Sequence, residues 1–465
     1  MHASNGIHPT RRAIRGRAFG LIGAFGVVLS LVGAPRARAE EPAPSPSPAP
    51  AEEERFTGLP RHGTWTFNLD AGLGAFGFAN SLYTNSRPDP SGNLSDDWAE
   101  SFVKPALSAS FVTGRSEVYS KVSVVGERTF AAPPSLVGEE ASSFQVEDLH
   151  IGWRSGKTLG TENLLDFSVG REQYKLGHGL ILWDGAGEGG SRGGFWSNAR
   201  KAWQFAAVAR VKPKNHTFEA FYLDRDEVPE SDSGTTLFGG NYEFALGDKS
   251  TFGATYLKFN ADKLVRPLRD GMNVFNARAY TGVSNFSFEG EYVHEDNGDL
   301  FSSSAWMAQV GYEFSGMGWK PKVSYRYAAF EGDDPTTPKK EGFDSLLPGF
   351  YDWGTWWQGE IAGEYFLSNS NLTSSQVRLH LTPSDSVSGG LMGFLFRLDE
   401  PAALAPQVTS KDVAFEVDGY CDWKLNKAFT LSLVAAFADP KGAIQQAYNR
   451  TKTFAYGMAY IAYSY

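Results

Sequence analysis

The chain has 465 residues, a formal net charge of −10, and a large share of aromatic side chains: 34 Phe, 19 Tyr and 12 Trp. An ordinary soluble core does not need so many aromatic residues, whereas a transmembrane β-barrel uses them in two girdles and on its lipid-facing surface. The single cysteine, Cys421, excludes an intramolecular disulfide, and the acidic balance argues against nucleic acid as a partner.

Residues 1–39 have the pattern of a secretory signal peptide. Four arginines between positions 11 and 17 precede an apolar run from Ala18 to Gly33, and Ala37-Arg38-Ala39 is a small-x-small cleavage site. Six of the 43 basic residues, and no Asp or Glu, lie in this segment, so the remaining chain has 37 basic and 53 acidic residues and a net charge of −16. No apolar run of about 18 residues follows, so we expect no membrane-spanning helix.

The next segment, residues 40–60, is predicted to be a disordered linker on the periplasmic side. Glu40 to Glu54 reads EEPAPSPSPAPAEEE, and a segment so rich in Pro, Ala and Ser does not form a packed core. A plain spacer is the simpler interpretation, and binding of a periplasmic partner or of peptidoglycan is the alternative.

From residue 65 onward the apolar residues recur with a period of two, which indicates strands with one face for lipid and one for water. Clear examples are centred on Phe67, Ile151, Val310 and Leu379. This alternation predicts a β-sheet over most of the chain, because a helix would require a period of 3.6.

The last stretch, Thr453 to Tyr465, reads TFAYGMAYIAYSY and contains no charge and no proline. A terminal strand with an unpaired edge is a liability, so we expect this stretch to pair with Trp65 to Phe76 near the start of the sheet. Such pairing closes a sheet into a barrel, as a lipid environment requires. A C-terminal aromatic strand is also similar to the recognition signal of bacterial outer-membrane proteins.

The connections between strands alternate between short and long, which is typical of short periplasmic turns and long extracellular loops. Because both termini must lie in the periplasm, the strand number is even, and Trp357 to Tyr365 is assigned to a long extracellular segment. We therefore predict an all-β fold, a transmembrane antiparallel β-barrel of about 18 strands over residues 61–465 in the bacterial outer membrane, with 16 strands as the alternative. The short links are predicted at residues 113–116, 154–163, 212–216, 246–250, 281–285, 315–320, 382–386 and 424–427.

Several short motifs resemble the alginate-export family of outer-membrane proteins. In chain order they are Val169-Gly170-Arg171-Glu172, then Gly177, Gly179, Leu180 and Asp184, then Trp196-Ser197-Asn198-Ala199-Arg200, Phe330-Glu331-Gly332-Asp333, Phe343-Asp344, Leu347-Pro348 and Trp353-Gly354. Two residues usual in the family, an Asp near Trp203 and a His near Gly349, have no match. The resemblance implies a barrel channel, in the founding members one that passes an anionic polysaccharide through an arginine-lined lumen.

Charged residues on the lumen parity and in the loop motifs are the candidates for a translocation path. They are Arg171, Asp184, Arg192, Arg200, Arg210, Arg225, Arg278, Arg326, Arg378, Glu289 and Glu291. Lumen-parity acids are at least as numerous as basic residues, so Arg–carboxylate pairs that stiffen the wall are the alternative to a selective path. Arg171 shares the parity of Phe167 and Val169, which should face lipid, so either a bulge turns it inward or it lies above the hydrocarbon.

No enzyme active site is predicted, because the histidines show no spacing of a triad or a metal site. They are His150, His178, His216, His294 and His380. Besides a channel for small solutes or an anionic polysaccharide, two interpretations stay open: a barrel-anchored hydrolase, and a structural or adhesive barrel plugged by loops 172–202 and 331–371.

No cofactor is expected, although Ca²⁺ in the acidic extracellular loops at 295–299 and 333–334 is an alternative to plain turn chemistry. The expected partners are outer-membrane lipid and lipopolysaccharide, the barrel-assembly machinery, and a small solute or polysaccharide. We expect a monomer.

Overall fold

The structure is a computed structural model that describes residues 63–82, 94–131, 133–134, 140–349 and 358–465. The chain divides into two units, Met1–Ser47 and Pro48–Tyr465, and the barrel belongs to the second. The predicted signal peptide and linker lie outside the described residues. Among the described residues, no helix has the length and apolar character needed to cross a membrane.

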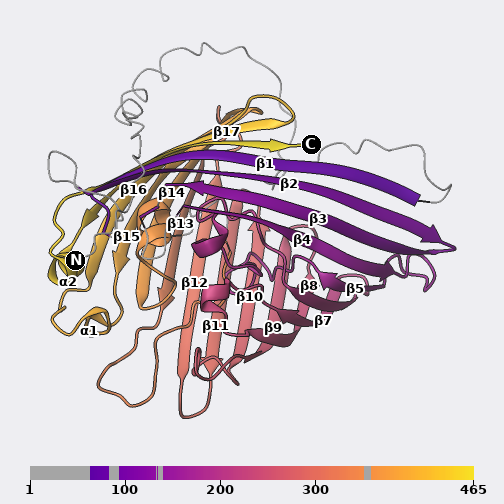
Figure 1. Cartoon of the computed structure of the whole chain (residues 1–465), viewed down its shortest axis with the longest axis horizontal. Coiled ribbons are helices and arrows are strands. Elements are labelled where there is room, and N and C mark those ends of the chain that lie inside the picture. The colour runs from indigo at the N-terminus through magenta and orange to yellow at the C-terminus, as the bar shows by residue number, and fades with distance from the viewer. Residues whose placement is uncertain (1–62, 83–93, 132, 135–139, 350–357) are drawn as a thin grey trace, which may run out of the picture. The chain divides into compact units, whose positions relative to one another are not determined.

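Eighteen antiparallel strands form one closed sheet in which each strand pairs with its sequence neighbours (Figure 1). The ring closes between β1 (Gly63–Ala79) and β18 (Phe454–Ser464), where Asp70 to Ala79 lie opposite Ala455 to Ser464. Leu69 and Tyr465 extend this seam with two backbone hydrogen bonds of 2.9 and 3.0 Å. The predicted barrel, its strand number and the pairing of its first and last strands are confirmed.

The strands range from 7 to 19 residues, a wider spread than the sequence predicts. After β1 they are β2 Ser95–Thr113, β3 Ser116–Phe130, β4 Ala141–Arg154, β5 Leu165–Arg171, β6 Phe205–Val211, β7 His216–Asp224, β8 Thr236–Ala245, β9 Ser250–Asn260, β10 Asn273–Val283, β11 Phe286–Asp296, β12 Ser302–Glu313, β13 Lys322–Phe330, β14 Leu372–Ser384, β15 Val387–Arg397, β16 Asp412–Lys424, β17 Phe429–Pro440 and β18. The helical turns are η4 Gly190–Arg192, η5 Pro229–Ser231, η6 Gly359–Gly363, α1 Pro401–Leu404 and α2 Gly442–Tyr448.

Short turns join the strands at one end of the barrel, called the turn end, and long segments join them at the other, the loop end. Each predicted short link coincides with a turn-end connection, for example Thr113 to Ser116 between β2 and β3. The described part of Trp357 to Tyr365 contains the π-helical turn η6, which confirms that this stretch is not a strand.

The outward face of the barrel is apolar and carries exposed aromatic residues near the loop end. Three cross-strand pairs of these residues lie side by side: Tyr222 with Phe238, Tyr256 with Phe275, and Tyr292 with Trp306. Aromatic girdles mark the membrane–water interfaces of transmembrane barrels. The alternation seen in the sequence therefore separates a lipid-facing surface from an inner wall.

A β-bulge in β4 changes which side chains reach the inside. The pairing of β3 with β4 shifts so that Ser123 lies opposite two residues, Glu147 and Asp148. The extra residue breaks the period of two, and both carboxylates turn inward and are buried.

Gly170 changes the direction of the chain at the end of β5. Its φ is +127°, and a Cβ atom at this position would lie 2.4 Å from the backbone oxygen of Leu149, so only glycine fits. Arg171 thereby leaves the lipid-facing parity of Phe167 and Val169 and contacts Asp226. The pairing of β4 with β5 has no bulge at Arg171, so the turn at Gly170, and not a bulge, accompanies the contact of Arg171 with Asp226.

Candidate functional site

Three loops of the loop end join one another and pack against the inner wall. Leu182 of the β5–β6 loop bridges Leu347 of the β13–β14 loop, and Ala186 bridges Asp226 of the β7–β8 loop. The backbone hydrogen bonds at these bridges are 2.8 to 3.3 Å long. The joined segments are called the loop plug and comprise residues 172–204, 225–235 and 331–349.

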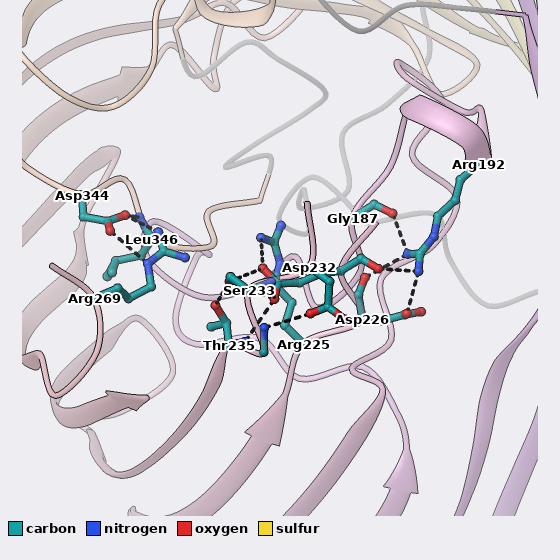
Figure 2. A network of polar contacts seen from close by, with 12 residues as sticks. Gly187, Arg192, Arg225, Asp226, Asp232, Ser233, Thr235, Arg269, Asp344 and Leu346 are labelled. Carbon is teal, nitrogen blue, oxygen red and sulfur yellow. Dashed lines mark hydrogen bonds and ion pairs between the residues drawn. The ribbon is translucent and has the colours of Figure 1, made fainter. Parts of the chain in front are cut away.

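Three arginines meet at one carboxylate of the loop plug. Arg171 and Arg200 both donate to Oδ2 of Asp226, and Arg192 donates to Oδ1 at 2.9 Å. Arg192 also donates to the backbone oxygens of Asp226 and Glu227 at 2.9 and 2.6 Å (Figure 2). Arg200 is fully buried and Arg192 is 6% exposed, so the three guanidinium groups of this arginine cluster share the Asp226 carboxylate away from bulk water.

The electrostatics of the arginine cluster favour an anion. Burial, and then the neighbouring Arg200, lower the pKa of Arg192 to about 10. Burial, and then the repulsion of Glu127, raise the pKa of Glu188 well above its ordinary value, so Glu188 tends to hold a proton. Four buried nitrogens have no protein acceptor, namely Nε of Arg171, Nε of Arg192, and Nε and Nη1 of Arg200. Guanidinium groups with free donors bind carboxylates and phosphates well.

A row of glutamates holds the segment Trp196–Ala202 against the inner wall. Glu100 of β2, Glu127 of β3 and Glu147 of β4 are at most 4% exposed, and their carboxylates accept backbone N–H groups of this segment. With Glu188 of the same loop they form the carboxylate clamp. Its hydrogen bonds run from Trp196 N (3.0 and 3.1 Å) and Ser197 N (2.8 Å) to Glu100, from Ala199 N to Glu127 (3.2 Å), from Arg200 N to Glu188 (2.9 Å), and from Lys201 N (2.7 Å) and Ala202 N (3.1 Å) to Glu147.

The same device recurs on another part of the wall. Glu416 of β16 accepts the N–H groups of Ile361 and Ala362 at 2.8 and 2.9 Å, and Asp418 accepts that of Glu360 at 3.2 Å. These are the first amides of η6, where a negative charge complements the helix terminus. Wall carboxylates therefore anchor two different loop segments through backbone amides.

Basic side chains face water on the inner wall near the turn end. Lys121 and Lys212 remain 32% and 39% exposed, whereas their partners Asp148 and Asp166 are 2% and 5% exposed. The water-facing side of these pairs is therefore positive. This turn-end basic wall consists of Lys121 (2.9 Å from Asp148), Arg154 (3.4 Å from Asp166), Arg210 (2.7 Å from Glu219) and Lys212 (3.2 Å from Asp166).

The other sequence-predicted path residues do not contact Asp226 through their side chains and lie elsewhere in the loop plug or along the wall. Asp184 pairs with Lys201, Arg225 with Glu227, Arg278 with Asn241 and Glu243, Arg326 with Gln376, Arg378 with Tyr420, Glu289 with His178, and Glu291 with Asn276 and Tyr280. The structure thus brings together Arg171, Arg192 and Arg200 and distributes the rest.

Sequence reasoning missed Asp226 and the three wall glutamates of the carboxylate clamp. Glu100 and Glu127 lie beyond the apolar alternation of β2 and β3, in stretches where the sequence shows no strand pattern although both strands continue. Glu147 lies at the bulge, where parity fails. The signal in the sequence that could have indicated the clamp is the presence of three Glu residues next to the apolar alternation of neighbouring strands.

His294 and the acidic loop at Asp334 make local hydrogen bonds. His294 Nδ1 lies 3.1 Å from Ser304 Oγ, and within the part of the chain that the structure describes no carboxylate is placed to orient that histidine. In the same described residues, no group of three His, Cys, Asp or Glu side chains could hold a metal ion. Asp334 instead accepts the N–H and hydroxyl of Thr336 at 2.8 and 2.7 Å, a turn contact.

The family model described as "Alginate export" matches residues 193–457, more than half of the chain. The chain belongs to the alginate export family. The match includes the loop segment held by the carboxylate clamp, Arg200 and Asp226 of the arginine cluster, the strands from β6 to β17 and the start of β18. No curated protein matches the chain significantly.

Solved outer-membrane proteins share the fold. OccK8 (OprE) of Pseudomonas aeruginosa has a TM-score of 0.54 at 10% identity, over 86% of this chain and 98% of that one. OpdK of Pseudomonas aeruginosa, solved with vanillate, has a TM-score of 0.53 at 12% identity over 86% and 98%. OccAB2 of Acinetobacter baumannii has a TM-score of 0.52 at 13% identity over 86% and 98%. With the closed barrel, membership of the alginate export family makes this protein an outer-membrane channel.

Proposed function

We propose that this channel passes small anionic solutes or an anionic polysaccharide, and that the turn-end basic wall is the surface along which they move. The single observation that carries the proposal is the layering of charge on this wall. Lys121 and Lys212 reach the water while Asp148 and Asp166 lie beneath them. An anion inside the barrel therefore meets cations first, although the mature chain as a whole is acidic.

The arginine cluster supports the same proposal at the loop end. Arg171, Arg192 and Arg200 gather around Asp226 with spare donors, so three guanidinium groups lie together in the loop plug. The family name points to a polymer of carboxylate-bearing sugars, and the vanillate in OpdK is also a carboxylate. Both are compatible with cations that face the water.

Ion selectivity in planar bilayers tests the proposal. We expect the purified protein to conduct with a preference for anions, and the double variant Lys121→Gln, Lys212→Gln to lose most of that preference. Lys249→Gln, in the exposed turn between β8 and β9, is the matched control and should leave the reversal potential unchanged. Absence of conductance, or equal cation selectivity in wild type and double variant, would overturn the proposal.

Short oligomers of a uronic acid add a second measurement. They should block the anion current of the wild type at millimolar concentration or below, and neutral oligosaccharides of equal length should block less. The Lys121→Gln, Lys212→Gln variant should lose the difference between the two.

The remaining features of the proposal concern the envelope. We propose that residues 1–39 direct export, that the barrel-assembly machinery inserts the barrel next to outer-membrane lipid and lipopolysaccharide, and that the protein works as a monomer without enzymatic activity. The apolar outward face with its aromatic pairs supports the lipid contact. We also propose that the channel needs no cofactor, since Asp334 of the acidic loop makes turn contacts with Thr336; a change of loop stability on addition of a chelator would favour bound Ca²⁺ instead.

A further inference from the structure

Three acidic residues of the inner wall lie close to the arginine cluster. Glu100, Glu127 and Glu147 face the lumen side near the arginine cluster, and as free carboxylates they would cancel its positive charge. The structure instead gives each of them backbone N–H donors from Trp196–Ala202.

The pattern of donors in this segment is nearly continuous. Six of its seven backbone N–H groups point to a carboxylate of the clamp, and the seventh, that of Asn198, donates to Gly194 O at 3.0 Å. Consecutive amides directed at anions form strong, oriented hydrogen bonds. The strands β2, β3 and β4 thus supply one acceptor each, at the spacing of adjacent strands, to a chain that crosses them.

Further contacts fix the same segment in one position. Lys104 of β2 donates to Ala199 O at 2.8 Å, and Thr129 of β3 accepts the N–H of Gly194 at 2.9 Å. Gly194 packs so closely that a Cβ atom would lie 2.9 Å from a carboxylate oxygen of Glu127. These contacts dock the segment against the inner wall. Because Arg200 belongs to the segment, the docking also places its guanidinium group at Asp226.

We propose that Glu100, Glu127 and Glu147 are positioning residues of the channel, whose carboxylates dock Trp196–Ala202 and thereby assemble the arginine cluster. They act through these backbone amides, because the ion-pair partner of Arg171, Arg192 and Arg200 in the described part of the chain is Asp226 and not a glutamate of the clamp. This inference rests on the proposed anion channel, because the arginine cluster is the element that it explains.

Two substitutions at one position separate positioning from simple charge. Glu127→Gln keeps an oxygen acceptor for Ala199 N and removes the charge, whereas Glu127→Ala removes both. If the residue positions the segment, the alanine variant is less anion-selective than the wild type, because the arginine cluster is no longer assembled, and the glutamine variant matches the wild type. If the carboxylate only cancels nearby arginines, both variants become more anion-selective by a similar amount, and the proposal is overturned.

Hydrogen exchange measured on the full chain in detergent gives a readout that does not depend on conduction. The amides of Trp196–Ala202 should exchange slowly in the wild type and about tenfold faster or more in Glu127→Ala and Glu147→Ala, with most protection restored in Glu147→Gln. Glu313→Ala, at the turn end of β12, is the matched control and should leave this exchange unchanged. If the alanine variants do not fold, the glutamine variants and the wild-type protection still decide the matter.

The two measurements keep the inference apart from the proposed function. A wild type that is protected but does not conduct anions would refute the proposed function and leave the docking in place. A wild type that conducts anions while Trp196–Ala202 exchanges freely would refute the inference alone.

Discussion

The loop plug and the turn-end basic wall both combine basic side chains with carboxylates, but in opposite arrangements. In the plug, arginines are buried around Asp226, and the glutamates beside them serve backbone amides. On the wall, Lys121 and Lys212 face the water and their acids lie beneath them. The comparison shows that the net charge of the chain does not describe the surface of this lumen. A carboxylate that accepts backbone amides holds a loop segment in place, and a carboxylate beneath a lysine holds that lysine at the water-facing surface. Four substitutions break or sharpen this contrast.

The largest effect is expected from Asp226→Ala. This variant leaves Arg171, Arg192 and Arg200 without their shared acceptor, and loss of one partner from a buried ion pair costs about 3–5 kcal/mol. We expect the midpoint of urea unfolding in detergent, followed by tryptophan fluorescence, to fall accordingly. Asp248→Ala, in the exposed β8–β9 turn, is the control, and an equal midpoint in both variants would refute the account of the cluster.

A smaller loss is expected from Gly170→Ala. Position 170 has a φ of +127° and no room for a Cβ atom, so the substitution should cost about 1–3 kcal/mol and displace Arg171 from Asp226. Gly393→Ala on β15 is the matched control, since a Cβ atom there meets nothing within 4 Å. If the two variants unfold at the same urea concentration, the turn at Gly170 does not require glycine.

The third prediction concerns pH and Glu188. Burial raises its pKa well above the ordinary 4.5, so the folded chain holds this proton to a higher pH than the unfolded chain. The free energy of unfolding should therefore decrease as pH rises from 4.5 through the raised pKa. Glu188→Gln cannot lose a proton, so its stability should decline less over this range. Parallel unfolding curves for the two proteins between pH 4 and 8 would count against the buried environment assigned to Glu188.

The smallest effect is expected from Arg397→Gln. Arg397 pairs with Asp412 at 3.0 Å, but both side chains are more than half exposed, so the pair contributes about 1 kcal/mol or less. Its unfolding midpoint should stay close to the wild type at moderate salt. A loss as large as that of Asp226→Ala would show that burial is not what separates the two regions.

The fold was predictable because strand periodicity and link length are local properties of a sequence. The alternation around residues such as Ile151 and Val310 placed the strands, and the turn at Thr113 to Ser116 was read correctly. An even strand number was predicted because both termini were expected in the periplasm. That requirement excluded Trp357 to Tyr365 as a strand, as the structure confirms.

The site was less predictable because it depends on departures from that pattern. The bulge at Glu147 and the positive φ of Gly170 each change the side to which a neighbouring residue points. Glu127 lies on a strand that outlasts its apolar alternation. The meeting of Arg192 and Arg200 with Asp226 depends on contacts between loops that are distant in sequence, and no local pattern specifies them.

The seam between β1 and β18 has a consequence for how the protein is made. The residues that close the ring, Ala455 to Ser464, follow all the other described strands in the sequence and pair with the first of them. A shortened chain that lacks these residues has two unpaired strand edges and cannot form a closed barrel. The ring therefore closes only when β1 and β18 meet, so a copy shortened within β18 cannot complete the cylinder.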